Sequence, residues 1–282
     1  MSKKIKIVLA MVVLLGLADS ARAALPYYYW NWGTAGDWSS PSTWEGTVPT
    51  PTQAGGNQAM LCASNQLVTV TTPGQGAVDL IIGYAWPNTA TLRVDAGIYF
   101  KVANSLMIGM SSGNGVLDLY GTASSSGLRL GCSADSNGTM NIHDGATFTN
   151  DTWGCNIGET ASGIINMTGT GSLVTASPVT MNGLGRIDIE AGSLKVLGNY
   201  VTQLQGYVNN RWITSHGGTS PHCKTVVSYH DGYTWVTTSG CTCTTYLPAD
   251  INHDCYVDML DIEGLAQNWL VCINPTDTNC VQ

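Results

Sequence analysis

Residues 106–119 read LMIGMSSGNGVLDL, in which Leu106-Met107-Ile108 and Leu117-Asp118-Leu119 each place one residue between two apolar residues. A glycine follows the first triplet directly. Apolar residues that alternate in this way have the period of a β-strand, whose successive side chains point to opposite faces, and not the period of a helix. The stretch therefore predicts two short strands separated by a turn.

The same pair of triplets recurs five times between Leu80 and Asn199. The first triplets are residues 80–82, 106–108, 128–130, 155–157 and 179–181, and the second are residues 92–94, 117–119, 140–142, 165–167 and 187–189. The glycines Gly83, Gly109, Gly131 and Gly158 are spaced by 26, 22 and 27 residues. The recurrence indicates a repeat protein.

One triplet is too short to bury its apolar face alone, so the repeats must stack on one another. Strands would then pair between successive coils, about 4.8 Å apart. This predicts an all-β fold, a parallel β-solenoid (β-helix) of about five to six coils, right-handed by the crossover rule. The two predicted inward columns are Leu92, Leu117, Met140, Ile165 and Ile187, and Val94, Leu119, Ile142, Met167 and Ile189.

Two further features of the coils can be predicted. A third, weaker strand per coil is expected at residues 98–102, 146–149, 173–175 and 194–197. Corner glycines, which adopt positive φ without cost, are expected at Gly97, Gly121, Gly145, Gly169 and Gly192. An antiparallel sandwich is the competing fold, because Asn137-Gly138 and Asn182-Gly183 are hairpin-type dipeptides. The fivefold recurrence in register favours the solenoid.

Residues 1–23 have the pattern of a secretory signal peptide. Lys3, Lys4 and Lys6 precede the apolar run of residues 7–18, and Ala21-Arg22-Ala23 has the small residues of a cleavage site. The apolar run is too short to span a bilayer. We therefore expect a secreted, extracellular or cell-surface protein with no membrane span.

Without that segment the chain has 7 basic and 18 acidic residues, for a net charge of −11. Such a chain would repel nucleic acid and anionic membranes. We expect neither as a partner.

Residues 24–58 are rich in Tyr and Trp and would form an N-terminal cap over the first coil, ahead of the solenoid proper at residues 59–199. Flat aromatic faces can instead stack on sugar rings, so both uses stay open. The segment from Gly36-Asp37-Trp38 through Trp44 to Pro49 resembles the Trp-rich entry of secreted bacterial autotransporter-type β-solenoid repeats.

Residues 200–240 lose the repeat and are expected to form a β-hairpin cap, with residues 201–213 alternating loosely and a turn at Asp231-Gly232. A Thr/Cys-rich linker follows at residues 241–248. The last segment, residues 249–282, carries oxygen-bearing side chains at the spacing of an EF-hand-like calcium loop. The predicted Ca²⁺ ligands are Asp250, Asn252, Asp254, Tyr256 through its backbone carbonyl, Asp258 and Asp261.

From Leu260 onward an amphipathic helix is expected after this loop. Residues 249–270 resemble a type I dockerin repeat, which implies Ca²⁺ as cofactor and a cohesin-like or cell-surface protein as partner. The loop departs from the usual Ca²⁺ pattern at Cys255, where glycine makes the sharp turn, and at Asp261, where a longer Glu is usual, and a solvated acidic turn is the alternative. Met259 and Leu260 stand where the dockerin family has small hydroxyl residues that recognise cohesin. Members of the family normally have two such repeats, whereas this sequence has one complete repeat.

Nine cysteines in an exported chain favour disulfides, and the odd number leaves at least one unpaired within the chain. Six of them crowd the last 60 residues, where a small module would need cross-links. Cys241 and Cys243 with His222 and His253 are the alternative, a zinc site, but their spacing fits no common pattern.

The coils resemble those of parallel β-helix polysaccharide lyases, and this resemblance implies that catalytic groups would lie in the outward columns of the solenoid. These columns are Arg93, Asp118, Asn141, Asn166 and Asp188, and beside them Asp95, Tyr120, His143, Thr168 and Glu190. His143, followed by Asp144 and close to Asp118, is the one general-base candidate. The alternative is that these are the polar positions that any solenoid presents to water.

The sequence therefore favours a non-catalytic extracellular scaffold or attachment protein with a calcium-binding dockerin-like module, linked to polysaccharide binding or degradation. A polysaccharide lyase or glycoside hydrolase of the β-helix type is one alternative. A self-assembling structural subunit is the other.

Overall fold

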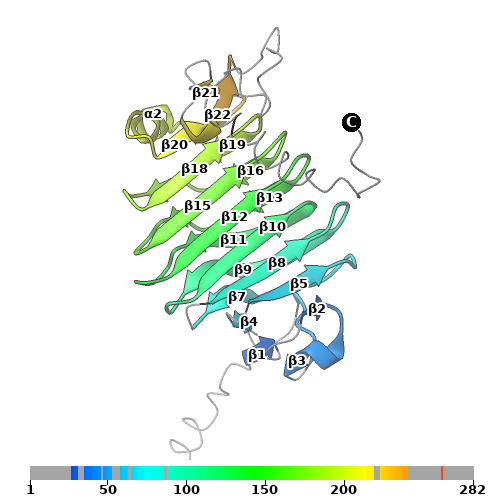
Figure 1. Cartoon of the computed structure of the whole chain (residues 1–282). Coiled ribbons are helices and arrows are strands. Elements are labelled where there is room, and N and C mark those ends of the chain that lie inside the picture. The colour runs from blue at the N-terminus through cyan, green and yellow to red at the C-terminus, as the bar shows by residue number, and fades with distance from the viewer. Residues whose placement is uncertain are drawn as a thin grey trace, which may run out of the picture.

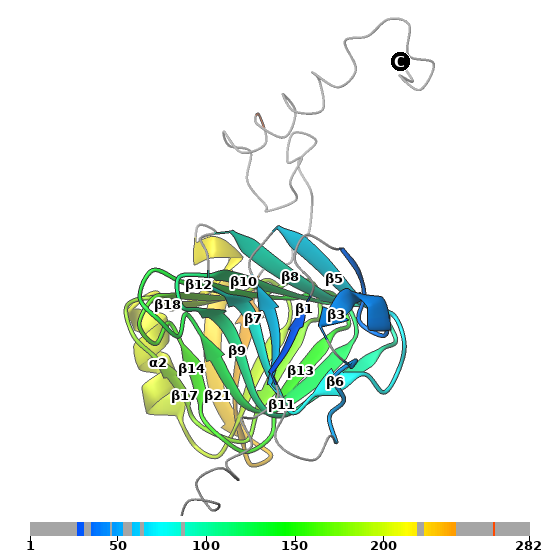
Figure 2. The ribbon, with the colours of Figure 1, turned by 90° about the horizontal axis from the view of Figure 1, so that it is seen from below.

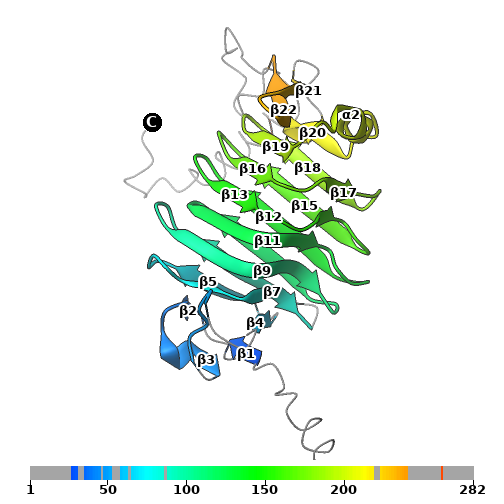
Figure 3. The same ribbon diagram turned by 180° about the vertical axis from the view of Figure 1, so that it is seen from behind.

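The computed structural model describes residues 27–30, 35–45, 47–52, 58–62, 65–85, 88–218, 223–240 and 262. These residues form a parallel β-solenoid of about six turns, mostly strand, with one α-helix (Figure 1). The predicted fold class is therefore confirmed. In Figure 3, seen from behind, the coils follow one another in chain order from the blue end to the yellow end.

The first sheet takes one strand from each coil, and its neighbours are parallel throughout. Its order is β2 (Gly36–Asp37), β5 (Gln66–Val70), β8 (Thr89–Val94), β10 (Asn114–Leu119), β12 (Asn137–Ile142), β15 (Ser162–Met167), β18 (Gly185–Ile189) and β20 (Ile213–Ser215). The second triplets lie in β8, β10, β12, β15 and β18. Pairing between coils, and not between sequence neighbours, excludes the sandwich.

The second sheet has 14 strands and covers the rest of each coil. It contains β1 (Tyr27–Trp30), β3 (Trp44–Glu45), β4 (Gln58–Cys62), β6 (Gly76–Ala77), β7 (Asp79–Tyr84), β9 (Tyr99–Met110), β11 (Thr122–Leu130), β13 (Thr147–Asn150), β14 (Cys155–Ile157), β16 (Ser172–Thr175), β17 (Val179–Met181), β19 (Ser193–Leu197), β21 (Lys224–His230) and β22 (Tyr233–Ser239). Figure 2, seen from below, shows how the two sheets enclose the interior.

The weak third strand of each coil is present, and in two coils it is continuous with the first triplet of the next repeat. β9 and β11 each run through both segments without a break, whereas in later coils the chain separates them, as in β13 and β14. A coil made of β4 and β5 precedes the first aligned repeat and pairs with β7 and β8.

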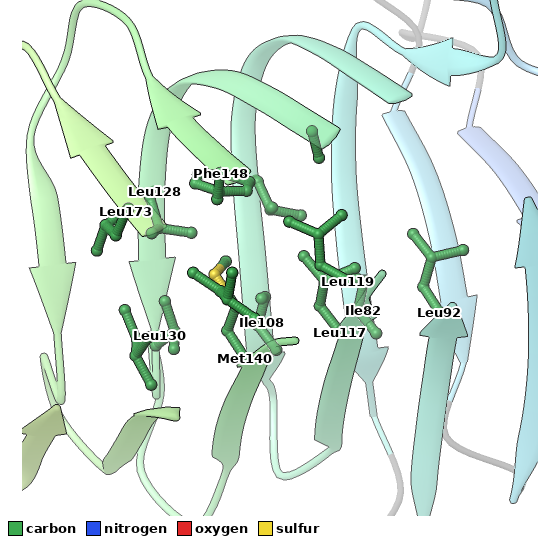
Figure 4. Packing of buried hydrophobic residues seen from close by; sticks show 14 of the residues in the cluster. Ile82, Leu92, Ile108, Leu117, Leu119, Leu128, Leu130, Met140, Phe148 and Leu173 are labelled. Atoms are coloured by element: carbon green, nitrogen blue, oxygen red, sulfur yellow. The ribbon is translucent and has the colours of Figure 1, made fainter. Parts of the chain in front are cut away.

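The interior is filled by the two predicted columns, and each of their ten residues is at most 1% exposed. Figure 4 shows Leu117 and Met140 pointing into the same interior as Ile82 and Ile108 from the facing sheet. Full burial of one such side chain contributes about 1.5–3 kcal/mol to folding. Stacked columns of this kind hold successive coils together.

The corner glycines serve two different purposes. Gly97, Gly145 and Gly169 have positive φ, of 76°, 73° and 52°, as predicted. Gly121 and Gly192 do not adopt positive φ, so that prediction is wrong for them. Glycine is needed there for space, because an added Cβ would overlap the carbonyl oxygens of Asp95 and Gly171 respectively.

Three tryptophans pack at the N-terminal end of the core. Trp44 meets Trp30 and Trp38 edge to face, with ring centroids 4.9 and 4.7 Å apart. The Trp44 indole donates a hydrogen bond to the Trp38 carbonyl oxygen, at 2.9 Å. Both Trp30 and Trp38 are fully buried, so these rings do not present a face to a sugar.

The other end is covered by helix α2 (Val201–Asn209), by β20 and by the β21–β22 hairpin. The loose alternation read at residues 201–213 is wrong, because most of that stretch is helical and buries Leu204. The hairpin turn predicted at Asp231-Gly232 is confirmed, since both residues have positive φ and β21 pairs antiparallel with β22.

The signal segment (residues 1–23), the linker (241–248) and the C-terminal module apart from Ile262 lie outside the described residues. Among the described residues, no helix is long and apolar enough to cross a membrane.

Candidate functional site

The outer surface of the eight-stranded sheet carries the candidate residues. The strand register places Arg93, Asp118, Asn141, Asn166 and Asp188 in one column, one residue per coil. The second column contains the residue that directly follows each of these strands: Asp95, Tyr120, His143, Thr168 and Glu190. The predicted arrangement of the first column is therefore confirmed.

Side chains of the first column hydrogen-bond to one another along the solenoid. The Asn166 amide donates to Asn141 Oδ1 at 2.9 Å, and the Asn141 amide donates to Asp118 Oδ1 at 2.7 Å. Each such bond contributes about 0.5–1.5 kcal/mol. The column is a ladder whose polar groups are largely used within the protein.

His143 is held in a stack of planar groups. Its ring lies parallel to that of Tyr120, with centroids 3.9 Å apart and an interplanar angle of 5°. The Arg93 guanidinium lies over the Tyr120 ring at 4.7 Å and pairs with Asp95 at 2.8 Å. A cation over an aromatic face is attracted by the ring quadrupole, so the whole stack is stabilising.

The orientation of His143 decides its chemistry. Its Nε2 is buried, has no hydrogen-bond partner and lies 3.8 Å from Asp118 Oδ1, which is beyond hydrogen-bonding distance. A general base needs a nitrogen within about 2.6–3.2 Å of the proton that it removes. Nε2 is enclosed by the protein and is not placed to take a proton from a bound molecule.

Asp144, the neighbour of His143, is committed to the corner of the coil. Its Oδ1 accepts hydrogen bonds from the Thr170 backbone N–H and hydroxyl, both at 2.8 Å. These bonds to Thr170 lower the pKa of Asp144. The carboxylate orients the turn of the next coil.

Next to His143 the sheet surface is hollowed, with a volume of about 410 Å³. A second hollow of about 470 Å³ adjoins it and shares Glu190 and His216. The first is lined by Asn141, His143, Asn166, Met167, Thr168, Asp188, Glu190 and His216, and the second by Gly169, Glu190, Ala191, His216, Thr238, Ser239 and Gly240. Together they form an open groove from the ladder to the end of β22.

His216 was not predicted for this surface. It lies in the short 3-10 turn η2 (His216–Gly218), with a positive φ of 49°. Asp188 Oδ1 holds this turn by accepting hydrogen bonds from the Thr214 hydroxyl at 2.7 Å and the Gly217 N–H at 2.8 Å. The signal available in the sequence was Ile213-Thr214-Ser215, a short alternating triplet that continues the sheet after α2.

Three cysteines of the solenoid, Cys62, Cys132 and Cys155, are free thiols. Burial raises the pKa of Cys155 to about 12, and burial is also the main cause that raises the pKa of Cys132 to about 11. Thiols with such pKa values are protonated and unreactive at neutral pH. Cys223, the one C-terminal cysteine within the described ranges, is disulfide-bonded.

The predicted Ca²⁺ ligands from Asp250 to Asp261 and the histidine and cysteine set of the zinc alternative lie outside the described residues. Within the described part of the chain, no three His, Cys, Asp or Glu side chains are grouped so that they could hold a metal ion.

Comparisons of the chain with models of protein families, with curated proteins and with solved structures found no match. The likenesses to autotransporter-type repeats and to dockerins rest on the sequence motifs alone.

Proposed function

We propose that this protein is an extracellular scaffold or attachment protein, in which the solenoid is a spacer that carries a calcium-binding module at residues 249–282. The observation that carries the proposal is the different, non-repeating structure at each end of the coil stack. The tryptophan cluster covers one end, and α2 with the β21–β22 hairpin covers the other. Such covers give a solenoid a fixed length.

The proposed calcium site rests on the spacing of oxygen-bearing residues in the sequence that follows the solenoid. Asp250, Asn252, Asp254, Asp258 and Asp261 provide oxygens at loop positions one, three, five, nine and twelve. Ca²⁺ takes six to eight oxygen ligands, and a loop of this length can bring them to one point. A docking partner, a cohesin-like or cell-surface protein, would then bind the calcium-loaded module and not the solenoid.

Calorimetric titration of the mature protein with Ca²⁺ tests the module. We expect one binding event that is lost in Asp250→Ala/Asp254→Ala and kept in the control Asp135→Ala, whose side chain is exposed in a solenoid turn. Absence of heat in the unmodified protein, together with an unchanged melting temperature, would contradict the proposal.

The second candidate function is action on a polysaccharide, which the open groove beside His143 favours. Its polar lining combines amide, carboxylate and imidazole groups, which can hydrogen-bond sugar hydroxyls. We would incubate the protein with acidic and neutral glycans and measure both binding and product release. Binding that is lost in Glu190→Gln but kept in Glu159→Gln would assign the groove, because Glu159 pairs with Arg129 on the other sheet.

Product release separates catalysis from binding. Loss of product in His143→Ala, with binding retained, would support a lyase or hydrolase in spite of the enclosed Nε2. Binding without product would leave the groove as an attachment site. The absence of both binding and product would exclude this candidate for the glycans tested.

A further inference from the structure

Among the described residues, strand β21 is the outermost strand at one end of the larger sheet. It pairs with β22 over all seven of its residues, and it is the last strand in the sheet order of the described residues. Four of its seven side chains are exposed, among them Val226 at 39% and Tyr229 at 47%, and the other three are partly buried. An edge strand of this length presents backbone N–H and C=O groups that can pair with another strand.

We propose that two copies of this chain associate through β21, paired antiparallel about a twofold axis at Val227. In this arrangement Thr225 of one copy lies opposite Tyr229 of the other, and the two Val227 residues face each other. Val227 is only partly buried against the core, so pairing would cover more of it. Apolar and aromatic cross-strand pairs each contribute about 0.2–1 kcal/mol.

The charges at the two ends of β21 favour an antiparallel partner. Lys224 begins the strand, and His230 ends it with its Nδ1 3.0 Å from Asp231 Oδ2. Antiparallel pairing places the Lys224 ammonium of each copy beside the His230–Asp231 pair of the other, and the twofold axis repeats this contact. Parallel pairing would place one Lys224 beside the other, which is unfavourable.

The opposite end of the solenoid offers no comparable edge among the described residues. The last strand there, β3 (Trp44–Glu45), has two residues and is paired with β1. An interface that uses one end only and is related by a twofold axis closes after two copies. The assembly is therefore a dimer, and the self-assembling subunit that the sequence left as an alternative would form closed pairs and not a filament.

Sedimentation of the full mature chain over a range of concentrations, with a calcium chelator to exclude contacts through the C-terminal module, tests the dimer. We expect a monomer–dimer equilibrium that Lys224→Glu and Asp231→Asn each weaken by about tenfold, because each change removes two symmetric charge contacts. Asn tolerates the left-handed backbone of residue 231, so the turn should be kept. Lys101→Glu, the same charge change at an exposed position of β9, should have no effect.

Far-ultraviolet circular dichroism would establish that each variant is folded before its association is compared. A wild-type chain that stays monomeric at every concentration up to about 1 mM overturns the proposal. So does a dimer that Lys224→Glu and Asp231→Asn both leave unchanged, or one that Lys101→Glu weakens equally.

Discussion

At the scale of single residues, the coils require glycine for two physically distinct reasons. Gly97 and Gly109 have the same φ of 76°. No atom lies within 4 Å of a Cβ added at Gly97, whereas a Cβ at Gly109 would overlap the carbonyl group of Asn137 in the next coil. Conformation alone explains the first glycine, and the second is also required by the close approach of two coils.

Alanine substitutions of Gly97 and Gly109 separate the cost of the left-handed backbone from the cost of the close approach of two coils. Gly97→Ala should lower the free energy of unfolding by about 1–2 kcal/mol, the cost of a left-handed L-residue. Gly109→Ala should cost about 1–3 kcal/mol more, because the neighbouring coil must move. Urea denaturation of both variants measures the difference. Equal losses would mean that Gly109 does not set the spacing of the coils.

Asp37 near the N-terminal end gives a pH dependence with a definite sign. Burial acts to raise its pKa, but hydrogen bonds from Ser39 and Thr71 outweigh burial, so the pKa of Asp37 lies below its ordinary value of 3.8. A carboxyl group with a lowered folded-state pKa stabilises the fold above the unfolded pKa, and this stability is lost as the pH falls through the folded pKa.

We therefore expect Asp37→Asn to be less stable than the wild type at neutral pH, with the difference shrinking as the pH falls below 3.8 and through the lowered pKa of folded Asp37. Thermal melts of both proteins at several pH values measure this. The exposed control Asp135→Asn should follow the wild type throughout. A constant difference between Asp37→Asn and the wild type at all pH values would contradict the linkage.

At the scale of elements, strands that repeat were predictable and the helix was not. The triplets of β8, β10 and β12 alternate strictly, and recurrence in register leaves one way to stack them. α2 has nine residues, with Gly206 in its middle and only Leu204 fully buried, so its helical period is short and weak. The helix lies where it covers the end of the core, and the local sequence pattern does not reveal that position.

Leu204 should be the residue by which α2 contributes stability. Leu204→Ala removes a fully buried side chain and should cost about 2–5 kcal/mol. Thr202→Ala on the exposed side of the same helix should change stability by less than about 0.5 kcal/mol. Chemical denaturation measures both. A Leu204→Ala loss as small as that of Thr202→Ala would show that α2 does not cover the core.

At the scale of the whole molecule, the sequence predicted the ladder of the outer surface but not the groove beside it. Asp118, Asn141 and Asn166 follow from the period of two, because each coil contributes one residue at the same register. His216 reaches the same surface only after the chain has passed through α2 and returned to the sheet as β20. The contribution of His216 to the groove depends on this tertiary path of the chain, so the local sequence pattern does not predict it.

The stacking of coils also determines how the molecule should open. Within the described ranges, each inner coil is paired on both sides, whereas the outermost strands of the sheets are paired on one side only. In a stack stabilised by contacts between neighbours, opening begins at the ends. Amide hydrogen exchange should therefore be slowest in β10, β12 and β15 and become faster toward β5 and β20. Uniform protection along the eight-stranded sheet would instead indicate that the solenoid opens as one cooperative unit. Protection that is highest at β20 would place the most stable structure at the end covered by α2 and the β21–β22 hairpin.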